Sequence, residues 1–229
     1  MNALTPFRLL YLCFNAIFFP GLILGLGGDL HWTEGWIFTA WFVCTVFGSA
    51  FYLNRRDPAL LAERFKRPGS GGQKGWDKVF MALLMSMVVF WFIVMPLDAR
   101  RFHWTASFPL AWKVTGLLLL LCAVYIIMRT MFDNSFASPL VRIQRERDHH
   151  IITTGIYGVV RHPMYLGGLM YFFGAPLLLG SKYGLLIGLL LSLMFVARIF
   201  GEEKTLLTQF PDYADYRQKV RHRLIPFVW

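Results

Sequence analysis

The chain has 229 residues, of which 56% are hydrophobic, 17% aromatic and only 16% charged, and its formal net charge is +10. A soluble domain carries nearer a quarter charged residues, so this composition predicts an integral membrane protein and excludes an ordinary soluble enzyme. The positive charge indicates cytoplasmic loops rich in Lys and Arg, and it gives no support for nucleic-acid binding.

Six apolar segments reach membrane length, at about 20 residues per span. They cover residues 9–28, 35–53, 79–97, 110–132, 163–181 and 183–201. We therefore expect an all-α integral membrane protein with about six transmembrane helices, a C-terminal helical hairpin and an interfacial tail. The remaining loops are too short for a separate nucleotide-binding domain of about 100–150 residues, so any cofactor must be held by the helices and their loops.

The distribution of basic residues predicts the orientation. Lys and Arg gather in segments 54–78 and 133–162 and in the tail, whereas the opposite side holds only Arg100, Arg101, Lys113 and Lys182. Both termini are then expected to be cytoplasmic. Because residues 180–183 alone join the last two spans, these must form an antiparallel hairpin whose open ends, near His162 and Glu202, meet on the cytoplasmic side.

A short helix is expected between the second and third spans. Asp57 is typical of a helix N-cap and Pro58 of the first helical position, opening a helix over residues 59–67. Its leucines would lie in the membrane interface, with Arg64 and Lys66 turned toward water.

Several kinds of chemistry have no support in the sequence. Cys13, Cys44 and Cys122 lie within apolar runs without metal-like spacing, so they are interpreted as small core side chains. The chain has no His-Glu-x-x-His run, no Cys/His cluster and no nucleophilic-serine elbow. We therefore expect no metal site and no acyl-enzyme intermediate.

The fifth and sixth spans carry candidate binding residues at their open ends. Pro163 fits the first helical position, with His162 near the cap, and the free N–H groups of this helix end favour an anion. An ordinary capped helix explains the same pattern. Arg198 and Glu202 share one helix face; they form an ion pair along the helix or bind separate partners, and Arg before Glu is the weaker orientation for a pair. Glu203 points about 100° away and is expected to be solvated.

Aromatic and basic residues alternate in the tail over residues 210–229, a pattern typical of an interfacial segment. His149 and His150 lie in a charged loop, and taken alone they would be solvated.

The combination of these pieces resembles a known family. Arg161-His-Pro-Met-Tyr-x-Gly, Glu202-Glu203-x-x-Leu, Tyr213-x-x-Tyr and a closing Ile-Pro-Phe occur in this order, and together they resemble the isoprenylcysteine carboxyl methyltransferases. That family belongs to a wider set of membrane methyltransferases that includes phospholipid N-methyltransferases. The resemblance covers about residues 134–229, and the first four spans match only in hydropathy. We divide the chain into an N-terminal four-helix region, 1–132, and a methyltransferase-like region, 133–229.

The resemblance implies that S-adenosylmethionine is bound between the last two helices and the tail. It implies catalytic roles for Arg198, Glu202 and His162, and makes Arg198 the substrate-contacting residue. The implied cofactor-binding residues are Gln144, His149, His150, Ile151, Ile152, Tyr157, His162, Pro163, Met164, Tyr165 and Glu202.

The expected acceptor is a lipophilic carboxylate that enters from the bilayer. A carboxylate with a pKa near ~4 is already ionised and needs no general base, and Arg198 is able to hold it with two hydrogen bonds. The substrate and membrane lipids are then the expected partners, with the active site on the cytoplasmic side.

One alternative function is methylation of a phospholipid or other amine, for which only His162 or Glu203 would serve as base. A reductase of the sterol-reductase type, which uses NADPH, is another. A transporter or assembly factor has less support, because no charged residue lies mid-span.

Overall fold

The computed structural model describes residues 3–70 and 72–229, and within them every regular element is helical. The elements are α1 (Pro6–Gly27), α2 (Thr33–Arg56), α3 (Pro58–Arg64), α4 (Gly75–Pro96), η1 (Leu97–Arg101), α5 (Leu110–Asp133), η2 (Arg145–Arg147), η3 (Gly155–Gly158), α6 (Pro163–Leu179), α7 (Lys182–Gln209) and α8 (Tyr213–Lys219). The prediction of an all-α membrane protein is confirmed, because five of the described helices are long and apolar enough to cross a bilayer. The sixth predicted span, α6, has 17 residues, so the count of six stays a prediction.

The predicted spans match the apolar parts of the helices, but several helices begin earlier or end later than predicted. The largest difference is at α7, which continues to Gln209 rather than ending near residue 201. Residues 202–209 are mostly polar but are mostly good helix formers, and the helix ends just before Phe210 and Pro211. Hydropathy detects the apolar part of the helix, whereas the helix itself continues through the mostly polar residues beyond it.

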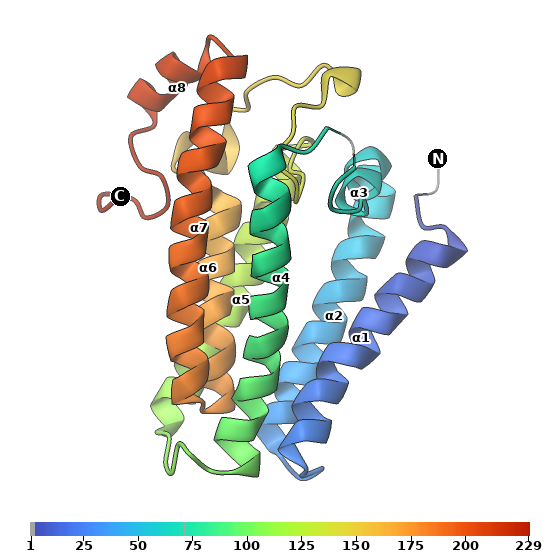
Figure 1. The fold of residues 1–229 in the computed structure, drawn as a ribbon, viewed down its shortest axis with the longest axis vertical. Helices are drawn as coiled ribbons and strands as arrows, with labels where there is room; N and C mark the ends of the chain where they lie inside the picture. Colours follow the sequence, from blue (N-terminus) through green and yellow to red (C-terminus); the bar gives the residue numbers. More distant parts are fainter. Residues whose placement is uncertain (1–2, 71) are drawn as a thin grey trace.

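The bundle has two distinct ends (Figure 1). The upper end carries α3, α8, the loop of residues 134–162, the start of α1 and the C-terminal residue, whereas the lower end carries the short connections after α1, η1 and α6. The segments rich in Lys and Arg gather at the upper end, as the hairpin topology requires.

Close helix packing depends on small residues between α5 and α6. A Cβ atom on Gly116 would lie 2.3 Å from the backbone nitrogen of Leu178, and one on Gly167 would lie 2.6 Å from the side chain of Ile127. Glycines at such crossings let helix backbones approach closely in a membrane. This contact brings the end of α5 and the loop that follows it against the start of α6.

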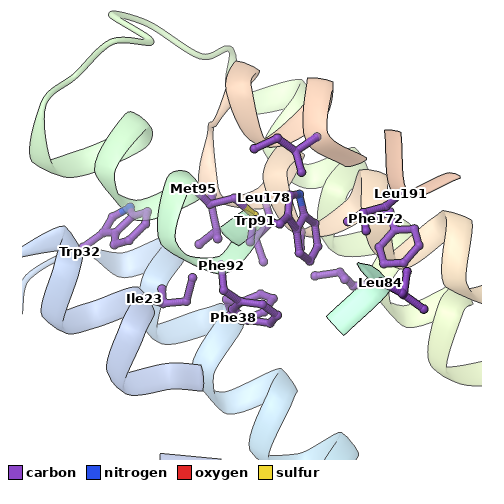
Figure 2. Close-up of a cluster of buried hydrophobic side chains, with 14 of the residues drawn as sticks. Ile23, Trp32, Phe38, Leu84, Trp91, Phe92, Met95, Phe172, Leu178 and Leu191 are labelled. Carbon is purple, nitrogen blue, oxygen red and sulfur yellow. The ribbon is translucent and has the colours of Figure 1, made fainter. Parts of the chain in front are cut away.

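The main core is a cluster of buried apolar side chains from α1, α2, α4 and the α6–α7 hairpin (Figure 2). Phe38, Trp91, Phe92 and Phe172 meet there, and the Trp91 indole nitrogen donates to the Gly184 carbonyl at 2.8 Å. This packing joins α4 to α2 and to the α6–α7 hairpin. The hairpin is thereby held at its closed end, which leaves its open end to form a site.

The position of α3 differs from the prediction. Its cap is as expected, since the Asp57 side chain accepts from the Leu60 amide at 2.8 Å. Its leucines, however, are buried against protein, and Arg64 does not point to water: its Nη1 donates to the Ala137 carbonyl at 3.0 Å. The helix packs over the loop that follows α5 and is held there by the contacts of Arg64 with Ala137 and of Glu63 with Arg142.

The tail packs partly against the rest of the protein, and its place at the membrane interface stays a prediction. Tyr213 and Tyr216 on α8 are 2% and 4% exposed, so they pack inside the protein. Beyond α8 the chain folds back, and the Arg161 amide donates to the His222 carbonyl at 3.0 Å. The tail therefore forms a wall of the upper end.

Candidate active site

The two open ends of the α6–α7 hairpin converge, as the topology predicts. The Tyr165 hydroxyl on α6 donates to Glu202 Oε2 on α7 at 2.6 Å. One residue further along α7, Glu203 Oε1 lies 3.3 Å from His162 Nε2. Groups about forty residues apart in sequence thus meet at the upper end.

A cavity of about 340 Å³ opens at this convergence. Its volume is within the range of small-molecule sites, about 300–1,000 Å³. All but one of the residues singled out from the sequence line it, namely His149, His150, Ile151, Ile152, Tyr157, His162, Pro163, Met164, Tyr165, Arg198 and Glu202. The exception is Gln144.

Gln144 lies behind the cavity wall. It is fully buried, its Nε2 donates to the Phe136 carbonyl at 2.8 Å, and its Oε1 accepts from Arg147 at 2.7 Å. Both ends of its amide are therefore used to hold the loop in shape. The sequence around Gln144 could not show that its side chain points away from the cavity, because the direction of a loop side chain depends on the conformation of the whole turn.

His149 is not solvated, contrary to the expectation for a charged loop. Its ring stacks on Phe136 with centroids 4.5 Å apart, and its Nδ1 accepts from the Gln144 amide at 3.3 Å. Burial, helped by the positive charges of His150 and Arg147, lowers the pKa of His149 to about 4. The ring is therefore neutral at pH 7, and its proton is on Nε2.

Tyr157 supports the cavity from η3. Its hydroxyl accepts from Asn134 Nδ2 at 2.9 Å, and its backbone carbonyl accepts from the Tyr216 hydroxyl at 2.8 Å. Burial raises the pKa of Tyr157 and outweighs the opposing hydrogen bond from Asn134, so the phenol stays neutral. The residue thereby links the loop after α5 to α8.

The start of α6 follows the sequence prediction in its geometry. His162 is the N-cap and Pro163 the first helical residue. The His162 amide donates to the Arg223 carbonyl at 2.9 Å, however, and the Tyr165 amide donates to the His162 carbonyl at 3.1 Å. Since proline has no N–H, the helix end offers a ligand fewer donors than the sequence suggests, chiefly the Met164 amide.

Arg198 does not pair with Glu202. Its Nε donates to Asp77 Oδ1 at 2.9 Å and its Nη2 to the Pro139 carbonyl at 2.7 Å, and Asp77 Oδ1 also lies 2.9 Å from Nη2. The weaker orientation for an ion pair along the helix had favoured separate partners, and that prediction is confirmed. The edge of the guanidinium that presents two parallel N–H groups is therefore already occupied.

Asp77 is the functional neighbour that the sequence did not identify. It is fully buried, and its Oδ2 accepts from Gln73 Nε2 at 2.7 Å and from the Val141 amide at 2.9 Å. It thus joins α4, the loop after α5 and α7. Asp77 lies 121 residues from Arg198, so no local spacing links them. The one available signal was an acidic residue at the boundary between a basic loop and an apolar span.

The expectation that Glu203 is solvated is wrong. The residue is 4% exposed, and its two oxygens accept from Arg161 Nε at 2.8 Å and Arg223 Nε at 3.1 Å. The tail folds over this side of α7 and excludes water there. The two adjacent glutamates consequently differ: Glu202 faces the cavity, whereas Glu203 fastens the tail to the start of α6.

A third buried ion pair fixes α3 to the loop after α5. Arg142 Nε donates to Glu63 Oε1 at 2.7 Å, and Lys66 lies 2.7 Å from Glu63 Oε2. Burial acts to raise the pKa of Glu63, but the hydrogen bonds and charges of Arg142 and Lys66 outweigh it and lower the pKa. This pair holds the cavity wall against α3.

Comparison with known proteins identifies similar chains. A family model described as phospholipid methyltransferase matches residues 112–212. The protein-S-isoprenylcysteine O-methyltransferase of Schizosaccharomyces pombe is 42% identical over 85 residues, which cover 36% of each chain. That of Saccharomyces cerevisiae is 38% identical over 130 residues, which cover 53% of each chain. The matches therefore span about a third to a half of these relatives.

Solved structures share the fold, among them that of the eukaryotic intramembrane Ras methyltransferase, isoprenylcysteine carboxyl methyltransferase, with a TM-score of 0.54 and 21% identity over 97% of this chain and 85% of that chain. The matched residues 112–212 contain the α6–α7 hairpin and part of the cavity wall. The resemblance predicted from the motifs is thus confirmed: this chain is similar to protein-S-isoprenylcysteine O-methyltransferases, and part of it matches the phospholipid methyltransferase model.

Proposed function

We propose that this protein is a membrane methyltransferase that uses S-adenosylmethionine to methylate the carboxylate of a lipophilic acceptor, in the manner of isoprenylcysteine O-methylation. One observation carries the proposal: a single cavity is lined by the polar groups of the hairpin's open end and by apolar residues of the helix bundle, including Met81, Leu84, Ile127 and Phe195. Such a site is suited to a polar methyl donor and an apolar acceptor together. The names of the similar relatives support this chemistry.

The cavity wall fits the methyl donor. The Tyr213 hydroxyl is buried on the cavity wall and has no hydrogen-bond partner among the described residues, so a bound polar molecule would satisfy it. Glu202 is the cavity-lining carboxylate and would hold the donor's ammonium group. His149 and His150 with residues 151–152, Tyr157, and residues 162–165 would contact the remainder. When bound, the donor supplies an electrophilic methyl group on sulfur.

The chain's own part in the reaction is alignment. A carboxylate acceptor is ionised at neutral pH and needs no base, so holding the reactants in line supplies most of the acceleration. The two candidate bases for an amine acceptor, His162 and Glu203, are bound to each other at 3.3 Å, and Glu203 also holds two arginines. Glu203 is thus already held by its three partners, whereas a carboxylate acceptor needs no base at all. Among the proposed catalytic groups, His162 orients the start of α6 and Arg198 lies on the cavity wall.

Arg198 has a narrower role here than bidentate binding of the acceptor. Its Nε–Nη2 edge binds Asp77 and Pro139, so Nη1 is its remaining donor toward the cavity. We place the catalytic groups in residues 133–229, as the sequence division suggests, and add Asp77 of α4 as the residue that positions Arg198.

We also propose that the upper end, with both termini and the cavity, is cytoplasmic, because the Lys- and Arg-rich segments gather there. Positions 72, 182 and 215 are exposed and suit single cysteines in a background without the three native ones. A membrane-impermeant thiol reagent should label position 182 only from outside and positions 72 and 215 only from the cytoplasm. Labelling of position 182 from the cytoplasm would overturn this orientation.

The experiment that tests the function has two arms. Calorimetry on the purified protein should show binding of S-adenosylmethionine and no binding of NADPH; the reverse would indicate a reductase. Membranes are then incubated with a radioactive methyl donor, and the labelled lipids are treated with mild base. A carboxyl methyl ester releases its label as methanol, whereas an N-methyl group keeps it. Base-stable label would replace the proposal with amine methylation, and absence of any label would overturn methyl transfer to lipophilic acceptors.

A further inference from the structure

The arginines around the cavity differ in how their charges are balanced. Three of the four that line it are ion-paired with a buried carboxylate: Arg142 with Glu63, Arg161 with Glu203, and Arg198 with Asp77. The fourth is Arg64, which has no carboxylate partner among the residues that the structure describes. Its described contacts are the Ala137 carbonyl at 3.0 Å and the Met164 sulfur at 3.7 Å, and both are neutral.

The geometry of Arg64 leaves its anion-binding edge available. Both described contacts use Nη1, so Nε and Nη2 have no partner within the described part of the chain. That edge presents two parallel N–H groups, which match the two oxygens of a carboxylate. The corresponding edge of Arg198 is already occupied by Asp77 and Pro139. Arg64 is therefore better suited than Arg198 to receive a carboxylate.

Arg64 is also partly withdrawn from water. The side chain is half-buried beneath the loop after α5, and burial lowers the pKa of its guanidinium, against a smaller effect of Tyr157. An arginine nevertheless remains protonated in proteins. A partly desolvated cation without an anion is costly, so binding a negatively charged group here would be favoured.

The position of Arg64 indicates where that group comes from. Arg64 and Ile127 line the active-site cavity and also a second cavity of about 340 Å³ between α1, α2, α3 and α5. The second cavity is mostly apolar, with Leu12, Phe42 and Met128 among its lining residues. Arg64 thus lies at the junction between an apolar cavity in the helix bundle and the cavity proposed for methyl transfer.

We propose that Arg64 binds the carboxylate of the acceptor while the acceptor's apolar chain occupies the second cavity. The substrate class is an amphiphile with one carboxylate at the end of an apolar chain. This inference rests on the proposed function and adds a specificity-determining residue to it. Arg64 supplies the unbalanced positive charge, and Arg198 holds the loop beside it through Pro139.

The test compares a charged acceptor with a neutral copy of it. N-acetyl-S-farnesylcysteine is the methylation substrate, and its carboxamide, which keeps the chain but loses the charge, is a competitor. With the full-length protein in lipid nanodiscs, the acid should bind the wild type more tightly than the amide does. Arg64→Gln should raise the KM for the acid by about 10-fold or more and abolish the preference for acid over amide, while leaving the dissociation constant of S-adenosylmethionine unchanged.

Matched variants separate charge from folding. Arg67→Gln changes an exposed arginine of the neighbouring segment that lines neither cavity, and it should retain the wild-type preference. Arg64→Lys keeps the charge but loses the planar edge, so it should retain the preference and raise KM. If Arg64→Gln does not fold, the folded Arg64→Lys variant decides the question. Loss of the preference for acid over amide in Arg64→Lys, or a KM for the acid that equals the wild-type KM, overturns the proposal.

Two other results would also overturn it. A preference for the acid that persists in Arg64→Gln removes Arg64 from the acceptor site. Weakened binding of S-adenosylmethionine in Arg64→Gln, with the preference intact, would assign Arg64 to the carboxylate of the donor. Failure of the wild type to methylate any lipophilic carboxylate is a different outcome, because it overturns the proposed function itself.

Discussion

The two ends of the bundle each contain a fully buried aspartate, but the two carboxylates have different partners. At the lower end, Asp98 accepts from the Thr105 amide and hydroxyl, the Ser181 hydroxyl at 2.6 Å and the Tyr183 amide at 3.1 Å. All of these donors are neutral. At the upper end, Asp77 binds the guanidinium of Arg198 beside a cavity.

The comparison shows that burial of a charge does not by itself mark a site. Asp98 lines none of the described cavities, and its hydrogen bonds join η1 to the turn between α6 and α7. Its charge is dispersed over hydroxyl and amide dipoles, which is a structural use. The upper end instead gathers several cations and carboxylates around an open volume, and one cation is left unbalanced. Substitutions at the two ends, and a change of pH, test this difference.

Glu203→Gln should have the largest effect, on the upper end. It would leave Arg161 and Arg223 without their shared buried carboxylate, and breaking a buried ion pair from one side costs about 3–5 kcal/mol. We expect a marked fall in the melting temperature in detergent, with release of the tail and loss of methyl transfer. Lys204→Gln, at the exposed neighbouring position, is the control. A wild-type melting temperature in Glu203→Gln would contradict the structural role.

Arg198→Lys should lower methyl transfer strongly and leave donor affinity nearly unchanged. Lysine keeps the charge beside Asp77 but cannot also hold the Pro139 carbonyl in the same plane, so the loop shifts. A displacement of about 1 Å can cost on the order of a hundredfold in rate. Single-turnover kinetics with saturating donor measure the step, with exposed Arg145→Lys as the control. Near-normal turnover would remove Arg198 from the acceptor side, and lost donor binding would assign it to the donor.

Glu202→Gln should weaken S-adenosylmethionine binding by about 1–3 kcal/mol, the range for loss of a hydrogen bond to a charged group. The Tyr165 hydroxyl can still donate to the glutamine oxygen, so the fold should be retained. Calorimetry measures the affinity. Unchanged affinity in the folded variant would show that Glu202 is not the partner of the donor's ammonium group. Glu202 would then have no role in donor binding that distinguishes it from Glu203.

Asp98→Asn tests the lower end. The NH2 group of the asparagine would replace one carboxylate oxygen, and the N–H and O–H donors that bind this oxygen would lose their acceptor. We therefore expect the free energy of unfolding to fall by about 1–2 kcal/mol. Donor affinity and methyl transfer per folded molecule should be unchanged, because Asp98 is remote from the cavity. Thermal unfolding and calorimetry on the same sample check both parts. A loss of donor binding without unfolding would show that the lower end influences the site.

The smallest effect concerns pH. Because the pKa of His149 is lowered to about 4 in the folded protein, the unfolded chain, with a pKa near ~6.5, binds the proton more readily. The resulting stability is present above about pH 6.5 and is lost as the pH falls toward about 4. The melting temperature should therefore fall between pH 7 and pH 5, and by less in His149→Asn. His103→Asn, at an exposed position, should behave like the wild type.

The sequence by itself determined the class of fold and the direction of the last helices. Hydropathy locates membrane helices because about 20 apolar residues are needed to cross the bilayer. The short connection near Ser181 requires a hairpin, so the meeting of His162 with the end of α7 followed from topology alone. Residue types at fixed spacing, such as Tyr165 before Gly167, were enough for the family resemblance, and all but one of the site residues that it implied line the cavity.

Only the tertiary structure decided which charges balance one another. The bonds from Arg198 to Asp77, from Arg161 to Glu203 and from Arg64 to Ala137 join residues 121, 42 and 73 positions apart. Such pairs depend on how helices rotate and how loops fold over them, and no local periodicity records that. For this reason the sequence predicted that Glu203 and Arg64 point to water, whereas packing of the tail and of α3 withdraws both side chains from it. Glu203 is paired with arginines, and Arg64 keeps one edge of its guanidinium without a partner among the described residues.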